Sequence, residues 1–465
     1  MTQPGSAESP LRVAVVGSGP AGFYTAEHLF KREGLTVTVD MFERLPMPFG
    51  LVRFGVAPDH QKIKGSTRAF ERIASRPEFR LFGNVDFGVH ISLEDLQRHY
   101  HLICFATGAQ TDRSLGIPGE NLIGSHPATA FVAWYNGHPD YWDYEVDLSA
   151  ERVAVVGVGN VAVDVARIFA RTPEELGRTD IADYALEALR GSNVREIYVL
   201  GRRGPAQAAF TNAELKELGQ LEGADLVIPA KDAALDEFSQ RQVDESDDRT
   251  ARKKVNLIQE LAGHEALGKA KRLVLRFLVS PVELTSNDGS RVTGMRLVRN
   301  ALFPSEDGSL RPRATDEFEE IPVDLVFRSV GYRGVALSGV PFDERRGLVP
   351  NEGGRVVSSE KGGTVPGLYV SGWVKRGPSG IIGTNKPDAG ATVECMLQDL
   401  ERGAVLDPDH PEPDAIERLV RKRQPEAISY GDWSKIDAIE VERGKASGRP
   451  RVKFTTTREA LEAIG

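Results

Sequence analysis

The sequence predicts an α/β protein with two Rossmann-like units, one inserted in the other, and three observations carry this prediction. Residues 12–26, RVAVVGSGPAGFYTA, form an apolar β-branched run that stops at a glycine and continues with helical spacing. Residues 152–167, RVAVVGVGNVAVDVAR, repeat the same pattern. Residues 367–372, GLYVSG, again read as a strand entering a glycine turn and return the chain to the first unit.

The glycines of each repeat follow the spacing of a dinucleotide-binding turn. In that turn the first glycine allows a tight bend, the second lets a pyrophosphate approach the backbone, and the third small residue lets helix pack on strand. The helix that follows directs its free amides at the pyrophosphate. One such motif is weak evidence in a glycine-rich chain, but two in the required order predict two bound dinucleotides. The motif residues are Gly17, Gly19 and Gly22 in the first unit and Gly157, Gly159 and Ala162 in the second.

The residues at the end of the second strand of each unit predict which nucleotide binds there. The strand Leu35–Phe42 ends in Glu43, where a carboxylate can bind a ribose diol, although an exposed strand-end charge is the alternative. The strand Glu196–Leu200 is followed by Arg202 and Arg203. Arginine forks suit a phosphate monoester, so the second unit is expected to hold the 2′-phosphate of NADP(H), unless both arginines are merely solvated. FAD is then left for the first unit.

The strand ends also predict the domain boundaries. We expect a discontinuous FAD-binding domain over 1–110 and 332–465, with an NADP-binding domain over 111–331 inserted in it. Residues 236–254 are highly charged without a clear apolar stripe, which predicts a surface excursion. Its basic residues indicate either a solvated helix face or a docking patch for an acidic partner. They are Arg249, Arg252, Lys253 and Lys254.

Composition excludes several classes of function. A net charge of -9 argues against a general nucleic-acid binder. The chain has two cysteines, Cys104 and Cys395, which lie too far apart in sequence for a C-x-x-C redox pair, and no metal cluster is expected. No apolar run reaches the length of a membrane span, and the first ten residues lack the features of a signal peptide. A cytoplasmic location is therefore expected.

Together these motifs resemble one family. The chain is similar over nearly its whole length to adrenodoxin reductase and its bacterial relatives, the FAD-dependent ferredoxin-NADP reductases of the glutathione-reductase-like class. Further stretches that carry the resemblance are APDHQKIK at 57–64, GRRGP at 201–205, AELKEL at 213–218, GWVKRGPSGIIGTN at 372–385 and GRPR at 448–451. The wider class usually has an aspartate at the position of Trp373. The adrenodoxin-reductase branch has a tryptophan there, as this sequence does.

The resemblance implies a set of cofactor contacts. It places FAD at Ala21, Glu43, Leu51, Val85, Trp373, Gly380, Ile381 and Ile382. It places NADP(H) at Asn160, Val161, Arg202, Arg203 and Glu214, with Gly380 near the nicotinamide. It also implicates His60 and Glu214 in the proton or electrostatic steps of reduction, although a hydrogen-bonded loop histidine is an equal alternative for His60.

The resemblance further implies an activity. NADPH is expected to pass a hydride to FAD, which then gives single electrons to an iron-sulfur ferredoxin, reversibly in principle. The alternatives are an NADPH-dependent flavin diaphorase or quinone reductase, a flavin monooxygenase, and a non-turnover NADP(H)-sensing flavoprotein. A disulfide reductase is excluded because the chain lacks a close cysteine pair.

Overall fold

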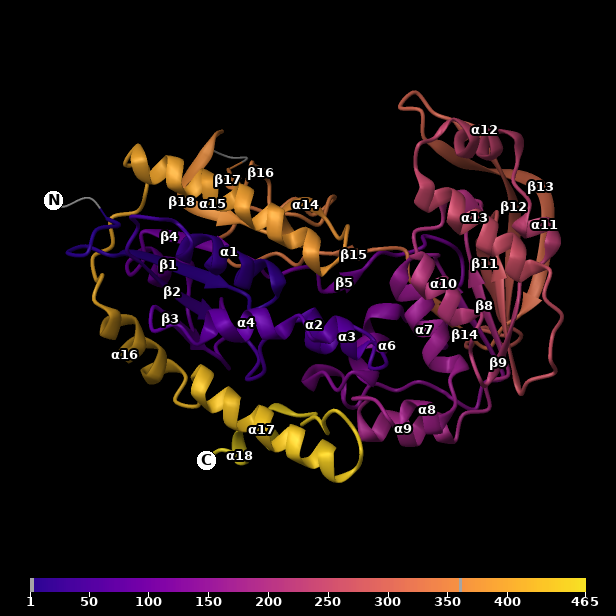
Figure 1. The fold of residues 1–465 in the computed structure, drawn as a ribbon, viewed down its shortest axis with the longest axis horizontal. Helices are drawn as coiled ribbons and strands as arrows, with labels where there is room; N and C mark the ends of the chain where they lie inside the picture. Colours follow the sequence, from indigo (N-terminus) through magenta and orange to yellow (C-terminus); the bar gives the residue numbers. More distant parts are fainter. Residues whose placement is uncertain (1–3, 359–361) are drawn as a thin grey trace. The chain divides into compact units, whose positions relative to one another are not determined.

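The computed structural model describes residues 4–358 and 362–465, which form two compact units. Unit 1 comprises Met1–Thr111, Asn136–Trp142 and Tyr332–Gly465, and unit 2 comprises Asp112–Tyr135 and Asp143–Gly331 (Figure 1). The chain enters unit 2 through β5 (Thr111–Asp112) and returns through β15 (Tyr332–Arg333), and these two short strands pair with each other.

Unit 1 is built on a seven-stranded sheet whose central strands are parallel. In spatial order the strands are β16 (Asn351–Glu352), β17 (Arg355–Val357), β18 (Thr364–Val370), β4 (Leu102–Phe105), β1 (Leu11–Val16), β2 (Val37–Phe42) and β3 (Phe79–Phe82). Every residue of β1 and β4 is buried, which explains why residues 13–16 and the whole of β4 read as uninterrupted apolar runs. The edge strands β16 and β17 are antiparallel.

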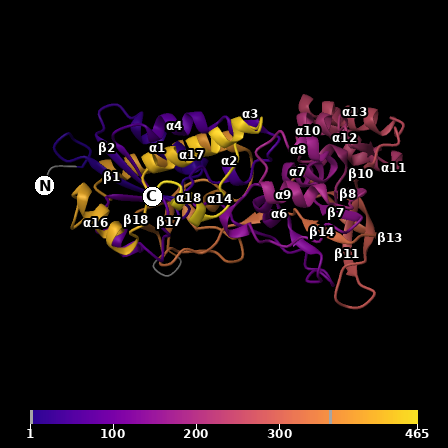
Figure 2. The same ribbon diagram turned by 90° about the horizontal axis from the view of Figure 1, so that it is seen from below.

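Helices cover both faces of this sheet (Figures 1 and 2). One face packs against α1, α4, α15 and α17, and the other against α5 and α16. The helices of unit 1 are α1 (Pro20–Phe30), α2 (Leu51–Phe54), α3 (Gln61–Lys64), α4 (Thr67–Ala74), α5 (Leu93–Gln97), α14 (Trp373–Arg376), α15 (Asn385–Glu401), α16 (Pro413–Arg423), α17 (Tyr430–Ala446) and α18 (Thr457–Glu462).

Unit 2 contains a six-stranded parallel sheet and a three-stranded antiparallel sheet. The parallel sheet is ordered β6 (Ser125–Pro127), β14 (Leu325–Arg328), β7 (Arg152–Val156), β8 (Glu196–Leu200), β10 (Lys271–Arg276) and β9 (Ala224–Val227). The antiparallel sheet is ordered β11 (Val279–Thr285), β12 (Gly294–Pro304) and β13 (Leu310–Pro322). The helices are α6 (Ala128–Tyr135), α7 (Asn160–Ala170), α8 (Pro173–Leu176), α9 (Asp183–Arg190), α10 (Asn212–Leu218), α11 (Ala230–Ala233), α12 (Glu237–Glu245) and α13 (Arg249–Ala262).

Both parallel sheets have the strand order of a doubly wound fold. In unit 1 the chain passes from β1 to β2 on one side and later places β4 on the other side of β1. In unit 2 it passes from β7 to β8 and later places β14 on the other side of β7. Such a reversal opens a crevice at the carboxyl ends of the strands, where α/β proteins bind their ligands. The two glycine motifs lie at these two points.

Residues 136–142 belong to unit 1, whereas the sequence placed them within the inserted domain. Their contacts explain the difference. Lys64 Nζ donates to Asn136 Oδ1 at 3.1 Å, and the ring of His138 lies 4.8 Å from that of Phe54. Arg44 forms a 2.7 Å ion pair with Asp140. These contacts are between residues far apart in sequence, so no local pattern could reveal them.

The charged segment 236–254 is more regular than the sequence predicted. It forms α12 and the start of α13, each with an aspartate, Asp236 or Asp248, capping its first turn. Val243 of α12 is buried, and the buried apolar residues of α13, which begin with Val255, lie beyond this segment. Because residues 236–254 themselves contain so few apolar residues, no apolar stripe could be recognised in them.

No helix among the described residues is long and apolar enough to cross a bilayer.

His126 in β6 should make the stability of the protein depend on pH. Its Nδ1 lies 2.6 Å from Tyr144 Oη and its ring stacks on Phe327. Burial, and then the positive charge of Arg328, lower the pKa of His126 to about 4. Because this folded-state pKa lies below the unfolded value near 6.5, stability is intact above about pH 6.5 and declines as the pH falls towards 4.

The loss of unfolding free energy that is due to His126 should reach roughly 2 to 3 kcal/mol at pH 4. Chemical unfolding at pH 7.5 and pH 5 of the natural chain and of His126→Phe, which keeps the aromatic stack, would measure it. The variant should lose less stability over this range, and equal losses would contradict the assignment.

Candidate nucleotide-binding sites

The first glycine turn is wedged between three strands of unit 1. Gly17 N donates to Phe42 O at 2.8 Å, and Ala106 N donates to Val16 O at 2.8 Å. Gly17 has a φ of 104°, and a Cβ at this position would lie 2.6 Å from Ala106 O. Only glycine fits here, because both the backbone angle and the neighbouring carbonyl exclude a side chain.

The next two motif glycines shape the start of α1. Gly19 is the N-cap of this helix, and no side chain caps its first turn. A Cβ on Gly19 would have no atom within 4 Å, whereas one on Gly22 would overlap Gly17 O. The tight contact packs helix on strand, and the open space above Gly19 lets an anionic group reach the free amides.

The Glu43 carboxylate is fixed by hydrogen bonds and is not a freely solvated charge at the strand end. Its Oε2 accepts from Ser18 N at 3.1 Å and from Ser18 Oγ at 2.6 Å, and its Oε1 accepts from Leu45 N at 3.0 Å. Val85, which is buried, donates its amide to Glu43 O at 2.9 Å. The structure therefore places a fixed acid and an apolar side chain together at the end of β2. Sequence reasoning missed Ser18, which lies inside the glycine motif.

A segment from the far end of the chain forms a second wall of this crevice. Gly372 has a φ of 79°, and a Cβ on it would lie 2.6 Å from the Cβ of Ala21. Gly372 N donates to Asp388 at 2.7 Å. These contacts bring Trp373 to the first turn of α1. An acid therefore still contacts this turn, because the Asp388 carboxylate of α15 accepts from Gly372 N. Trp373 itself stands at the position where the wider class has an acid.

The loop after Trp373 exposes backbone and one large apolar side chain. Trp373 Nε1 donates to Ser379 O at 3.2 Å, which fixes the start of this loop. Ile381 is 62% exposed, and Ile382 is half-buried. Gly380 has a φ of 80°. The loop thus offers a bare backbone and an apolar surface, as a planar aromatic ring system requires.

The segment 49–54 lies against the glycine turn and was only partly anticipated. Phe49 N donates to Ser18 O at 3.0 Å. Phe49 and Gly50 both have positive φ, and a Cβ on Gly50 would lie 3.1 Å from the Cα of Gly19. Leu51, the predicted contact, begins α2 and is 36% exposed. The sequence marked this segment only by its prolines and glycines.

These residues fit FAD. A dinucleotide needs an acid for a ribose, an open glycine turn with free amides for the pyrophosphate, and an apolar, glycine-containing wall for the ring. Unit 1 has residues that suit these three tasks, namely Glu43, Gly19 and the loop at 380–382.

Unit 2 repeats the geometry of the first turn. Gly157 N donates to Leu200 O at 2.9 Å, and Ser329 N donates to Val156 O at 2.8 Å. Gly157 has a φ of 135°, and a Cβ on it would overlap Ser329 O. Gly159 is an uncapped N-cap with open space at its Cβ position. The helix α7 begins with Asn160, whose buried Oδ1 has no partner among the described residues. Val161 and Ala162 complete its first turn.

The arginine pair follows β8, beside this second turn. Arg202 is exposed and Arg203 is half-buried. Burial, and then the charge of Arg202, lower the pKa of Arg203. Within the described residues no carboxylate pairs with either guanidinium. Two adjacent cations without an acid create a site for a doubly charged anion such as a phosphate monoester.

Backbone contacts hold the arginine pair in place. Asn300 Nδ2, from β12, donates to Arg202 O at 2.9 Å, and Leu278 N donates to Arg203 O at 3.1 Å. Asn300 is buried and also donates to Ser280 Oγ at 2.8 Å. Sequence reasoning missed Asn300, because nothing in the strand pattern marks it.

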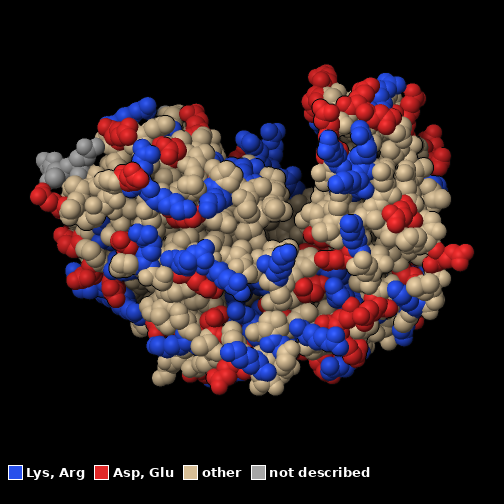
Figure 3. Space-filling model, viewed as in Figure 1, with Lys and Arg blue, Asp and Glu red and all other residues tan. Residues whose placement is uncertain are grey.

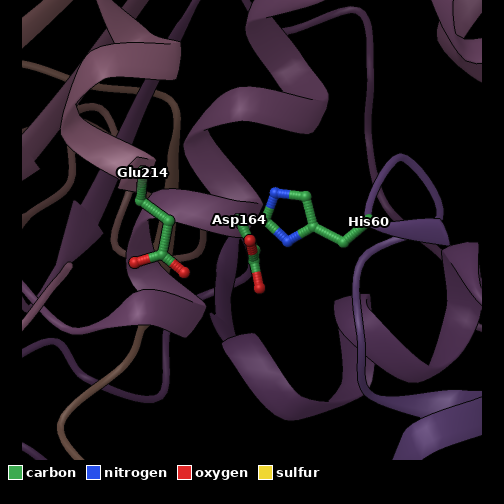
Figure 4. Close-up of side chains that lie close together, drawn as sticks. All are labelled: His60, Asp164 and Glu214. Atoms are coloured by element: carbon green, nitrogen blue, oxygen red, sulfur yellow. The ribbon is translucent and has the colours of Figure 1, made fainter. Parts of the chain in front are cut away.

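Glu214 completes the capping box of α10, whose N-cap is Thr211, and lies close to a second acid. Its Oε2 accepts from Thr211 N at 3.0 Å and from Thr211 Oγ1 at 3.1 Å. Its carboxylate lies within 4.8 Å of that of Asp164, which extends from α7 (Figure 4). Burial raises the pKa of Glu214, and the charge of Asp164 raises it further. Two buried acids this close together favour keeping one of them protonated.

His60 lies in unit 1, at the N-terminus of α3, and Figure 4 shows its ring extending from this turn. Its carbonyl accepts from Ile63 N at 3.0 Å and from Lys64 N at 3.2 Å. The role predicted for its ring stays a prediction.

Replacing Glu214 with glutamine should remove a titration from the pH profile of NADPH-dependent flavin reduction. The natural chain should show a group with a pKa above that of an ordinary glutamate, and Glu214→Gln should lack it. Asp164→Asn is the matched control, because removal of the neighbouring charge should move that pKa downwards. Stopped-flow measurement of flavin reduction between pH 4.5 and 8 would test both variants. Unchanged profiles in both would contradict the role of Glu214.

The fold and the two sites define a class of protein, an oxidoreductase with two dinucleotide-binding units. Residues 11–199 match the family model described as pyridine nucleotide-disulphide oxidoreductase. Both cysteines are free, however, with Cys104 buried in β4 and Cys395 half-buried in α15. The likeness to this class therefore does not extend to a cysteine pair.

Full-length relatives identify the family. The NADPH-ferredoxin reductase FprA of Mycobacterium tuberculosis is 44% identical over 97% of this chain and 98% of its own length. The human mitochondrial NADPH:adrenodoxin oxidoreductase is 41% identical over 98% of this chain and 93% of its own length. The structure of M. tuberculosis FprA in complex with NADPH is 44% identical, with a TM-score of 0.90, and covers 98% of this chain and 100% of that one. The chain belongs to the adrenodoxin reductase and ferredoxin-NADP reductase family.

Proposed function

We propose that this protein is an FAD-dependent ferredoxin-NADP reductase, with FAD bound by unit 1 and NADP(H) by unit 2. The observation that carries this proposal is the contrast between the two strand ends. A held carboxylate, Glu43, follows β2, and two arginines without acid partners, Arg202 and Arg203, follow β8. Relatives whose names include NADPH and ferredoxin support the proposed activity.

The residues of unit 1 would bind and orient FAD. When bound, FAD supplies the exchange between a two-electron hydride donor and a one-electron acceptor. The amides at the start of α1 would hold the pyrophosphate, Glu43 a ribose, and Val85 the adenine. Trp373 and residues 380–382 would lie along the ring system, with Leu51 on the segment that covers it.

The residues of unit 2 would bind NADPH. The first turn of α7, with Asn160 and Val161, would hold the pyrophosphate, and the arginine pair the 2′-phosphate. We propose that Glu214, whose pKa is raised by burial, carries a proton in the bound state. Glu214 and His60 are the two candidate residues for the proton or electrostatic steps of flavin reduction.

An iron-sulfur ferredoxin is the proposed electron acceptor, and an exposed basic surface would steer an acidic one. We propose Arg249, Arg252 and Lys253 for this surface, since all three are exposed, and Arg252 is so although its Nη2 also donates to Val243 O at 3.1 Å and to Ser246 O at 3.2 Å. Lys254, included in the sequence prediction, does not fit. Its Nζ donates to Ala208 O at 2.5 Å, and burial lowers its pKa. Basic and acidic side chains both lie over the region of α12 and α13 in Figure 3, so the steering would be local.

Replacing these three residues with alanine should slow electron transfer to ferredoxin about tenfold at low salt and little at high salt. Cytochrome c reduction with added ferredoxin would measure the effect, and ferricyanide reduction would show whether the flavin still turns over. Lys422→Ala, an exposed lysine on α16 of unit 1, is the control. A loss equal to that of the control would reject the patch.

Two observations test the proposed function itself. The purified protein should be yellow and should bleach without oxygen within the mixing time after NADPH is added. Cytochrome c reduction should then accelerate when a ferredoxin is supplied at low salt. Absent or slow bleaching would indicate an NADP(H)-sensing flavoprotein. Bleaching without acceleration would indicate a diaphorase or quinone reductase.

A further inference from the structure

Unit 1 contains a fully buried carboxylate that no proposed cofactor contact uses. Glu440 lies in α17 and is 0% exposed. Arg53 Nη1 donates to its Oε2 at 2.9 Å and Arg53 Nη2 to its Oε1 at 2.5 Å, which is a two-bond fork. Arg53 itself is 5% exposed. Burying such a pair costs desolvation free energy, so the pair is weak evidence for added stability. Its fixed geometry points instead to a positioning role.

The fork joins α17 to the segment 49–54 that lies on the first glycine turn. Phe49 and Gly50 contact Ser18 and Gly19, as described above. Trp433, also in α17, packs edge-on against the ring of Phe49 at 5.8 Å, and the guanidinium of Arg53 lies 5.1 Å above the Trp433 ring. One helix therefore contacts both ends of this segment.

Glu440 also organises the chain that follows α17. Phe454 N donates to its Oε1 at 2.9 Å, and Arg451 Nη1 donates to its Oε2 at 3.1 Å. Both carboxylate oxygens thus have two partners, and these partners come from segments almost 400 residues apart. Because each oxygen of the carboxylate already accepts two hydrogen bonds, the carboxylate can hold Arg53 in only one position.

We propose that Glu440 and Trp433 are positioning residues that fix the segment 49–54 over the FAD site and thereby set how tightly FAD is retained. This inference rests on the proposed function, because it assumes that FAD binds unit 1. Phe49 has a φ of 85°, a conformation that a phenylalanine keeps only when its surroundings hold it. Trp433 and the Arg53–Glu440 fork provide that restraint.

A second buried carboxylate in unit 1 offers a matched control. Asp40 in β2 is 2% exposed and accepts from Arg12 Nη2 at 2.8 Å, from Arg80 Nε at 2.7 Å and from Tyr100 Oη at 2.7 Å. Arg12 and Arg80 lie near the starts of β1 and β3, at the ends of these strands remote from the glycine turn. The two clusters have the same chemistry, and only one of them contacts the segment 49–54.

The test measures FAD release from the holoenzyme, by the rise in flavin fluorescence on dilution, for Glu440→Gln, Arg53→Lys and Asp40→Asn. Thermal unfolding of each variant is recorded alongside. We expect release to be about tenfold faster or more in the first two variants, with an altered visible circular dichroism of the bound flavin. Asp40→Asn should lower the unfolding temperature comparably but change release less than about twofold.

Equal release from all three variants, scaled to their stability, would overturn the inference, because Glu440 would then only stabilise the fold. If Glu440→Gln does not fold, Arg53→Lys decides, since it keeps the charge and loses the fork. A natural chain that carries no flavin would instead reject the proposed function, so the two failures are distinguishable.

Discussion

Replacement of both Arg202 and Arg203 with alanine is expected to raise the KM for NADPH about 100-fold or more while the KM for NADH changes little. NADPH and NADH differ only in the 2′-phosphate, and no carboxylate among the described residues pairs with these two guanidinium groups. Each charge-assisted contact contributes roughly 1.5 to 3 kcal/mol, so the two together contribute roughly 3 to 6 kcal/mol. The exposure of Arg202 places the sum near the lower value, about 3 kcal/mol.

The single variants should differ from each other. Arg203 is half-buried and its carbonyl is fixed by Leu278, so Arg203→Ala should cost more than Arg202→Ala. Steady-state ferricyanide reduction with each cofactor would give the KM values, and flavin content would show that unit 1 is unchanged. Equal increases for NADPH and NADH would mean that the pair stabilises unit 2 instead of recognising the phosphate.

The features of the sites that could be predicted are those encoded by local spacing. A glycine turn lies between consecutive elements, so Gly17 and Gly157 could be located from their neighbours, and the structure places both at a reversal of strand order. The strand-end residues Glu43 and Arg202 could be found by counting from the turn. The family resemblance, which spans the chain, added residues that no spacing marks, such as Trp373.

Contacts that depend on the folded arrangement could not be predicted. Asn300 holds the arginine pair from a strand almost 100 residues away, and Glu440 reaches Arg53 across nearly the whole chain. The seven residues 136–142 pack in unit 1 through Asn136 and His138, although the chain on both sides of them belongs to unit 2. A single sequence carries no signal for such pairs, because neither partner has a distinctive neighbour.

A crossed pair of substitutions, Gly19→Ala and Gly159→Ala, should separate the two nucleotide sites. At both positions a Cβ would enter open space, and the backbone, with φ of -77° and -96°, is extended and accessible to alanine. Neither methyl group should disturb the packing of the fold. Each would instead occupy the space through which a pyrophosphate approaches the first helical amides.

We therefore expect Gly19→Ala to weaken FAD binding by about 10- to 100-fold, and Gly159→Ala to keep FAD while raising the KM for NADPH by a similar factor. Flavin-to-protein ratio after purification and steady-state kinetics would measure the two effects, and thermal unfolding of the flavin-free proteins should be unchanged. Gly22→Ala is the contrasting variant, because its Cβ would overlap Gly17 O and should destabilise unit 1 directly. If Gly159→Ala lost flavin and Gly19→Ala kept it, FAD and NADP(H) would have been assigned to the wrong units, and neither Glu43 nor the arginine pair would select the nucleotide proposed for it.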